Sequence, residues 1–93
     1  MEVIHDRTSA GGRYRANVAG GEAELTYRLR DDGVMIIDHT FTPLQSRGRN
    51  IARQLVERAL ADAREENRLI DPKCPYVDKL FQRRADLNDL RAH

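Results

Sequence analysis

The sequence predicts a mixed α+β fold, with antiparallel strands in the first half of the chain and helices in the second. Up to about residue 41, apolar and polar residues alternate with the period of two that is typical of strands. From about residue 48, apolar residues recur instead at spacings of three and four, as on one face of a helix. A short apolar segment between two helical stretches adds a further strand.

Three strands are predicted in the first half. Residues 14–18 alternate in character, and residues 22–30 show the clearest alternation in the chain, with charged side chains on one face. Residues 31–33, Asp-Asp-Gly, form a hairpin turn. The third strand, residues 34–41, begins with an apolar run and ends before Pro43. Because that run is apolar on both faces, we expect the third strand to be central and covered on both sides.

A long helix is predicted over residues 48–66, with Asn67 as its C-terminal cap. Its apolar face consists of Ile51, Leu55, Val56, Ala59, Leu60 and Ala63. Residues 69–70 are expected to form a short buried strand, parallel to the third strand through a right-handed crossover. A second helix opens at Pro75, and a weak helical segment follows over residues 85–92.

Length and charge limit the possible functions. Ninety-three residues fit one domain, residues 1–93, in which a deep pocket is difficult to build. A net charge of +1 argues against nucleic acid as the main partner. Residues 1–46 carry five Lys/Arg against seven Asp/Glu, whereas residues 47–93 carry eleven against eight. We therefore expect the second half to attract an anionic ligand.

The single cysteine cannot form an internal disulfide, which indicates a reducing compartment. No apolar run approaches the roughly 18 residues of a membrane span, and the first residues lack the features of a secretion signal. These observations predict a cytoplasmic protein without a membrane partner. The histidines and the cysteine show no spacing typical of a metal site.

The segment between the third strand and the long helix, from Ser46 to Ala52, is a candidate anion site. A helix N-terminus presents unpaired N–H groups and the positive end of the helix dipole. In this segment Arg47 and Arg49 add charge, Gly48 permits close approach of the backbone, and Ala52 is small. On the residues alone, an ordinary strand-to-helix loop with solvated arginines is an equally good interpretation.

Several segments of the sequence, beginning before this turn, resemble those of a known family. Asp38-His39-Thr40, a short spacer, residues 47–52 (Arg-Gly-Arg-Asn-Ile-Ala) and then Leu55-Val56 are similar to the acetyl-CoA signature of the GNAT N-acetyltransferases. Residues 72–76, Pro-Lys-Cys-Pro-Tyr, resemble the small, cysteine-containing group often called YjdJ-type. The resemblance covers nearly the whole chain. It implies a GNAT-like acyl-CoA N-acyltransferase fold, acetyl-CoA (coenzyme A) as cofactor, and an amine acceptor that a macromolecule such as a protein could supply.

The resemblance also implies roles for residues. The cofactor-binding residues would be Phe41, Thr42, Arg47, Gly48, Arg49, Asn50, Ile51, Ala52, Cys74, Pro75 and Tyr76. Backbone N–H groups of residues 47–52 would hold the pyrophosphate, and the edge of residues 41–42 would pair with the pantetheine arm. The family usually has glycine where this chain has Asn50. Asparagine tolerates left-handed backbone angles, but its side chain could also crowd a phosphate oxygen.

Cys74 is the first candidate catalytic residue. It precedes Pro75 at a predicted helix N-terminus and lies next to Lys73, and positive potential there increases the thiolate fraction. A thiolate near a thioester could accept the acetyl group and pass it on. The resemblance implies the same place, near the acetyl group. The alternative is a small buried apolar residue.

His39 is the second candidate catalytic residue, because it follows the central strand and could take a proton from the attacking amine. It could equally be a structural histidine bonded to Asp38 or to a backbone carbonyl. Tyr76 could hydrogen-bond the cofactor sulfur or pack against Phe81. The sequence thus predicts an N-acetyltransferase that acts directly, with backbone donors near Phe41 stabilising the oxyanion, or through Cys74. A non-catalytic CoA-binding module is the rival prediction.

Overall fold

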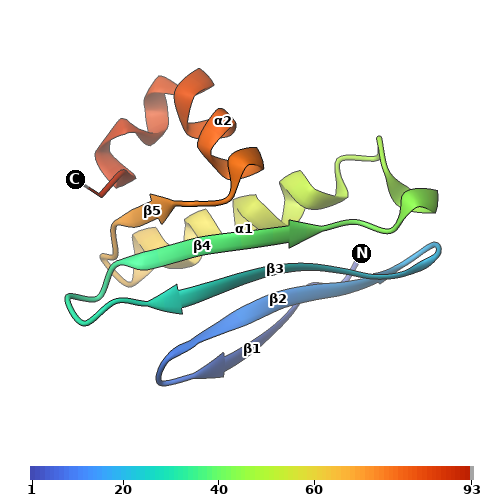
Figure 1. The fold of residues 1–93 in the computed structure, drawn as a ribbon, viewed down its shortest axis with the longest axis horizontal. Helices are drawn as coiled ribbons and strands as arrows, with labels where there is room; N and C mark the ends of the chain where they lie inside the picture. Colours follow the sequence, from blue (N-terminus) through green and yellow to red (C-terminus); the bar gives the residue numbers. More distant parts are fainter. Residues whose placement is uncertain (93) are drawn as a thin grey trace.

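The alternating first half of the chain forms a mixed sheet in a computed structural model that describes residues 1–92 (Figure 1). Its strands, in spatial order, are β1 (Ile4–Thr8), β2 (Gly11–Val18), β3 (Gly21–Leu29), β4 (Met35–Phe41) and β5 (Ile70–Pro72). Neighbouring strands are antiparallel except β4 and β5, which pair in parallel. The α+β class and the parallel pairing of the short last strand are therefore confirmed. The first strand was not assigned from the sequence, because its polar residues give no clear alternation.

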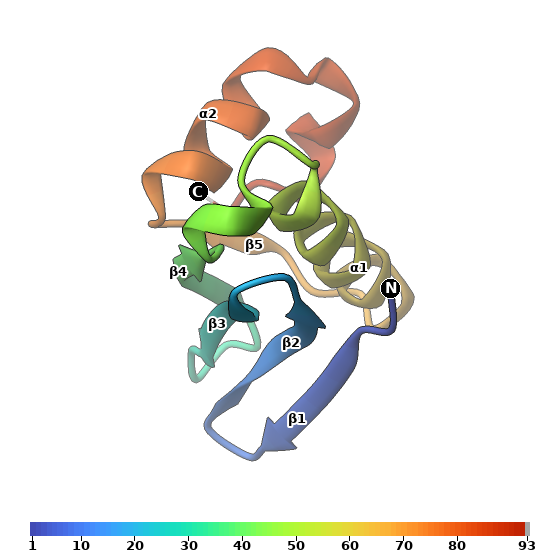
Figure 2. The same cartoon turned by 90° about the vertical axis from the view of Figure 1, so that its right-hand side faces the viewer.

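The helices of the second half cover one face of this sheet. They are α1 (Ile51–Glu65), α2 (Pro75–Arg83), and the 3₁₀ segments η1 (Leu44–Ser46) and η2 (Ala85–Leu90). Helix α1 packs against β2, β3 and β4, and α2 and η2 pack beside it (Figures 1 and 2). Apolar side chains from the strands and from all three of α1, α2 and η2 join one buried core cluster. None of the helices of residues 1–92 is both long and apolar enough to cross a membrane.

The other face of the sheet carries charged side chains instead of a helix. Arg13 contacts Asp6 and Glu24, and Arg28 contacts Asp38 across the strands. The prediction that the third strand is covered on both sides is therefore wrong. On the open face Ile36 of β4 is only half-buried and pairs in register with Arg28. The long side chain of a charged neighbour can shield a half-buried apolar residue from water. An apolar run in the sequence therefore does not show whether charged side chains or a second layer of helices cover that face.

A β-bulge near the end of β4 changes which of its side chains lie on each face of the sheet. Ile37 and His39 pair with consecutive residues of β3, so Asp38 is an extra residue in β4. The alternation of side chains reverses after the bulge. Thr40, rather than His39, therefore shares with Ile37 the face that α1 covers, and His39 lies on the open face.

Helix α1 begins later than the sequence predicted, at Ile51 rather than near Gly48. Gly48 and Asn50 have left-handed backbone angles, with φ of 83° and 59°, which a right-handed helix cannot include. At the other end Asn67 has φ of 57°, and the Arg68 N–H donates to the Ala63 carbonyl (2.8 Å). This is the Schellman arrangement, so the predicted cap at Asn67 is confirmed.

Candidate active site

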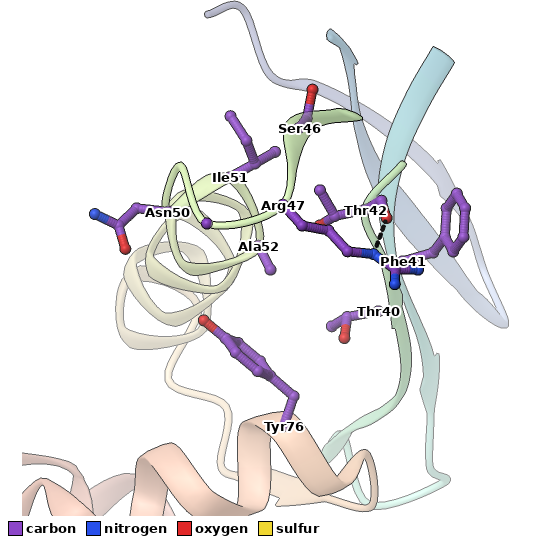
Figure 3. Close-up of a pocket in the computed structure, with 10 residues that line it drawn as sticks. Thr40, Phe41, Thr42, Ser46, Arg47, Asn50, Ile51, Ala52 and Tyr76 are labelled. Atoms are coloured by element: carbon purple, nitrogen blue, oxygen red, sulfur yellow. Dashed lines mark hydrogen bonds between the residues drawn. The ribbon is translucent and has the colours of Figure 1, made fainter. Parts of the chain in front are cut away.

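A cleft lies between the end of β4, the start of α1 and the first turn of α2 (Figure 3). Its volume is about 480 Å³. The residues that line it are Thr40, Phe41, Thr42, Ser46, Arg47, Gly48, Asn50, Ile51, Ala52 and Tyr76. Most of the predicted cofactor-binding residues are thus brought together at one place, because the parallel pairing of β4 and β5 sets α1 and α2 beside the same strand end.

The turn before α1 leaves a run of backbone donors without partners. The first hydrogen bond of the helix joins the Gln54 N–H to the Asn50 carbonyl (3.1 Å). Among residues 1–92, the N–H groups of residues 48–53 have no hydrogen-bond acceptor. Gly48 and Asn50 in this segment have left-handed angles, and successive N–H groups in such turns form anion-binding concavities. The geometry therefore favours an anion at this turn.

The start of α1 also lacks the groups that usually neutralise a helix N-terminus. Asn50 occupies the N-cap position but makes no side-chain capping bond, and the first turn holds no acidic residue. The positive end of the helix dipole is therefore uncompensated by side chains of the described residues. Figure 3 shows the Asn50 side chain pointing away from the other residues of the cleft. Asn50 thus adopts the angles that glycine would, without filling the cleft.

The loop that carries the turn is braced against the rest of the chain. Ser46 is 2% exposed, and its hydroxyl donates to the Ala19 carbonyl in the β2–β3 turn (2.7 Å). Arg47 Nε donates to the Thr42 carbonyl (3.0 Å), which holds the start of the turn to the end of β4. These contacts fix the turn before any ligand binds. The sequence placed Ser46 in the predicted turn without a role of its own, and nothing in the sequence marks its partner, which lies 27 positions away.

Cys74 is buried beside the cleft rather than on its wall. It is 5% exposed and occupies the N-cap position of α2, and its N–H donates to the Ile37 carbonyl (2.9 Å). Its Sγ lies 3.5 Å from Oγ1 of Thr40, a residue that lines the cleft. The sulfur is thus linked to the cleft through Thr40. Sequence reasoning missed Thr40 as a site residue, because only the bulge turns this side chain toward α2.

His39 is not brought into the cleft. Its side chain is exposed on the open face of the sheet, where Nε2 lies 3.5 Å from Oε2 of Glu24. The neighbouring Asp38 is engaged by the Thr26 hydroxyl (2.7 Å) and by Arg28 (3.2 Å). The structure therefore separates His39 from Cys74 by the thickness of the sheet.

The remaining predicted residues differ in whether they line the cleft and face into it. Arg49 and Pro75 are exposed and do not line the cleft. Phe41 lines it, but Figure 3 shows its ring turned to the far side. Tyr76 lines the cleft with its hydroxyl directed toward α1 and is 42% exposed, whereas Phe81 is buried in the core. Tyr76 is thus available to a ligand.

The arrangement can bind an elongated anionic ligand. Free N–H groups lie at the start of α1, and the end of β4 forms the adjacent wall, with Tyr76 opposite. A comparison with protein families gives this geometry a context. The model of a family described as GCN5-related N-acetyl-transferase matches residues 13–90. The matched region runs from β2 to η2 and contains the turn, the cleft and Cys74. The narrower cysteine-containing group stays a prediction.

Proposed function

The chain belongs to the GCN5-related N-acetyltransferase family, and on this premise we propose that it transfers an acetyl group from acetyl-CoA to an amine. Acetyl-CoA supplies the acetyl group in activated form, as a thioester. One observation carries the proposal: the N–H groups of residues 48–53 have no acceptor among residues 1–92, and Gly48, Asn50, Ile51 and Ala52 of this run line the cleft. We further propose that residues 1–93 act as one domain, since strands and helices share one core.

The residues of the cleft fit the shape and charge of this cofactor. The N–H groups at the start of α1, with Arg47 beside them, would hold the pyrophosphate. Residues 41–42 at the end of β4 would lie along the pantetheine arm. That arm would lead toward Thr40 and Tyr76, where the thioester would be placed. No acidic side chain lines the described cleft, so an anion meets no repulsion there.

In the direct route, the amine nitrogen forms a bond to the thioester carbonyl carbon and the carbon–sulfur bond breaks. Tyr76 is the residue that we place near the leaving sulfur, where its hydroxyl would donate a proton to the departing thiolate. The amine must lose a proton, and we assign that role to solvent rather than to His39, which lies on the open face. The acceptor is unidentified, and the open cleft suits an amine carried by a macromolecule.

The contact between Cys74 and Thr40 favours a second route. In it the Cys74 thiol gives its proton to solvent, and its sulfur attacks the thioester carbonyl, forms an acetyl-cysteine and releases the CoA thiolate. The amine then attacks the acetyl-cysteine and loses a proton to solvent, and the Cys74 thiolate leaves. Thr40 would orient the sulfur through the 3.5 Å contact. A non-catalytic acetyl-CoA-binding module is the remaining alternative, and acetyl transfer to trial amines separates it from both routes.

Thermal unfolding with and without acetyl-CoA, together with the intact mass, tests these proposals. At a hundredfold excess over Kd, binding should add about 2.7 kcal/mol to the free energy of unfolding. For a domain of this size this corresponds to a rise in Tm of several degrees or more. No rise at millimolar acetyl-CoA would contradict the cofactor assignment.

Cys74→Ser separates the two routes. An added acetyl mass in the wild-type protein that is absent in Cys74→Ser, together with loss of transfer to the trial amine, supports the acetyl-cysteine. Full transfer activity in Cys74→Ser supports the direct route instead. Thr40→Val, which keeps the shape but removes the hydroxyl, is the matched variant for the proposed orientation of the sulfur.

A further inference from the structure

Lysine is rare in this chain, and both lysines flank the residues that we place near the thioester. The chain holds fourteen arginines but only two lysines, Lys73 and Lys79. The guanidinium of arginine stays protonated, whereas a lysine amine that has lost its proton is a nucleophile. Lys73 directly precedes Cys74, and Lys79 lies in α2, three residues after Tyr76. The two side-chain amines are thus the first candidates for acceptors within the chain itself.

The two lysines differ in their acidic neighbours. Nζ of Lys73 lies 3.6 Å from the carboxylate of Asp71, whereas Lys79 forms no ion pair within residues 1–92. Of the sixteen Lys and Arg residues, eleven lie within 4.0 Å of an Asp or Glu oxygen in this described part. The five that do not are Arg47, Arg49, Arg53, Lys79 and Arg83. Lys79 is therefore the one lysine that no described carboxylate holds in place.

Lys79 lines a second hollow, which we name the α1–α2 groove. Its volume is about 210 Å³, and it is lined by Asn50, Arg53, Tyr76, Lys79, Leu80 and Arg83. Asn50 and Tyr76 also line the cleft, so the two hollows adjoin. The amine of Lys79 thus lies on the wall of a space that continues into the cleft.

Acidic residues near the groove are engaged elsewhere. Asp78, the neighbour of Lys79 in α2, accepts hydrogen bonds from Arg91 (2.9 Å) and from Gln82 (2.9 Å). Glu57 of α1 contacts Arg84. Within residues 1–92, no Asp or Glu lines the groove. The side chain of Lys79 is therefore not drawn away from the cleft by a described acid.

The spacing in α2 brings Lys79 to the same helix face as Tyr76. Side chains three residues apart on a helix are neighbours, with Cβ atoms about 5–6 Å apart. Figure 3 shows the Tyr76 hydroxyl directed toward α1, and this hydroxyl is the group that we place near the leaving sulfur. The amine of a lysine is carried on a flexible four-carbon stem. Rotation of the side chain alone is therefore expected to bring Nζ of Lys79 to the thioester.

We propose that Lys79 is an acceptor within the chain, so that the protein acetylates its own Lys79. The proposal rests on the acetyl-CoA site and the acetyl transfer proposed above. The Lys79 nitrogen, as the free amine, forms a bond to the thioester carbonyl carbon and loses a proton to solvent. The carbon–sulfur bond breaks, and the CoA thiolate takes a proton from Tyr76, which regains one from solvent. In sum, an ammonium and a thioester give an amide, a free thiol and one released proton.

Peptide mapping by mass spectrometry after incubation with acetyl-CoA provides the first test. Hydroxylamine is added before digestion, because it cleaves thioesters such as acetyl-cysteine and leaves amides intact. We expect a stable acetyl group on Lys79, in about tenfold or greater excess over Lys73, because Lys79 lies next to the bound thioester. Lys73 is the internal control, since its side chain is 65% exposed and open to acetyl-CoA in solution. In the protein unfolded by urea, the two lysines should be acetylated alike.

The second test shows whether the acceptor and the site belong to one molecule. Transfer within a chain proceeds with a rate constant that is independent of protein concentration, whereas transfer between chains speeds up in proportion to it. We expect the same rate constant over a twentyfold range of protein concentration at saturating acetyl-CoA. Lys79→Arg keeps the positive charge and should take up no stable acetyl group. Lys73→Arg is the matched control and should be acetylated as fast as wild type. Circular dichroism melts verify that both variants are folded.

The outcomes separate this inference from the proposed function. Equal acetylation of Lys73 and Lys79 in the folded protein, or a rate constant that rises with protein concentration, would overturn the proposal. A protein that acetylates trial amines but leaves Lys79 unmodified would also overturn it, while the proposed function stands. Failure to bind acetyl-CoA would contradict the proposed function itself, and with it the role of Lys79.

Discussion

The two ends of α1 share a local feature, but their backbone groups differ in whether the protein itself satisfies them. An asparagine with left-handed backbone angles flanks each end, Asn50 with φ of 59° and Asn67 with φ of 57°. After Asn67 the chain turns back over the helix, so that the N–H groups of Asn67 and Arg68 donate to the last carbonyls (3.2 and 2.8 Å). Before α1 the turn at Asn50 leaves the first N–H groups without an acceptor in the described part of the chain. One end is closed by the protein, and the other is left open to a ligand.

The side chains around the two ends of α1 differ in the same way. Near the C-terminal half of α1, the Tyr14 hydroxyl donates to Asp62 (2.8 Å), and the His5 ring stacks on Tyr14 at 3.9 Å between ring centres. A 2.7 Å hydrogen bond joins His5 Nε2 to the Tyr27 hydroxyl. Burial, and then the bond to Asp62, raises the pKa of Tyr14, so this hydroxyl stays protonated. Polar groups that satisfy one another stabilise the fold, whereas unsatisfied donors in the opposite region are available for binding.

The largest effect is expected from replacing the two asparagines by valine. A β-branched residue with positive φ is strained, so Asn50→Val and Asn67→Val should each lower the free energy of unfolding by about 1–3 kcal/mol. Only Asn50→Val should also weaken acetyl-CoA binding, by tenfold or more, because this turn carries the N–H groups that have no acceptor among residues 1–92. Urea denaturation and calorimetry measure the two quantities.

Glycine at the same positions is the control for this pair. Asn50→Gly and Asn67→Gly keep the left-handed angles, so both should retain stability and affinity close to wild type. An equal loss of acetyl-CoA affinity in Asn50→Val and Asn67→Val would contradict the expectation that only the N-terminal end of α1 binds the ligand.

The next effect, similar in stability but without an effect on affinity, is expected at the closed end. Asp62→Ala leaves the buried Tyr14 hydroxyl without its acceptor and should lower the free energy of unfolding by about 1–3 kcal/mol. Acetyl-CoA affinity should stay within twofold of wild type, since the cleft lies at the other end of α1. Asp62→Asn retains an acceptor oxygen and should recover most of the stability. A loss of affinity that exceeds the loss of stability would show that the two ends are coupled.

The smallest effect concerns pH. Burial, and then the charge of Arg7, lowers the pKa of His5 below its usual value, against the opposing charge of Asp62. The folded protein therefore binds a proton at His5 less readily than the unfolded chain. The contribution of His5 to the free energy of unfolding is complete above about pH 6.5. This contribution is lost as the pH falls from that value toward the lower pKa of His5 in the folded protein.

The measurement is the free energy of unfolding between pH 7.5 and pH 5.5, in the wild type and in His5→Gln. The wild type should lose more stability than the variant over this range. An identical pH dependence in the two proteins would exclude His5 as the cause.

Much of the fold could be predicted from local pattern. The alternation in β2 and β3 and the apolar face of α1 follow from side-chain periodicity, and Asn67 was found because its residue type suits the left-handed cap. The first strand and the true start of α1 could not be predicted in the same way. The start of α1 depends on backbone angles at Gly48 and Asn50, which residue types permit but do not dictate.

The candidate site was predicted less completely than the fold. The turn was found because arginine, glycine and a following helix are contiguous in the sequence. Thr40 was missed as a site residue, and the bracing role of Ser46 in the turn was missed, since these depend on a bulge in β4 and on a partner in the β2–β3 turn. His39 was favoured for its chemistry and its place after a buried strand, but the same bulge turns it to the open face.

The sequence by itself determined the order of strands and helices after β1, indicated the family and pointed to the candidate anion-binding turn, because each depends on residues that are close along the chain. Only the tertiary structure decided which side chains share the cleft and which cations stay unpaired. Both depend on pairings between distant segments: β4 with β5, which brings Thr40 to Cys74, and α1 with α2, which sets Arg53 beside Lys79 and Arg83. A charge that is merely present in the sequence becomes available to a ligand only when packing leaves it without an acidic neighbour.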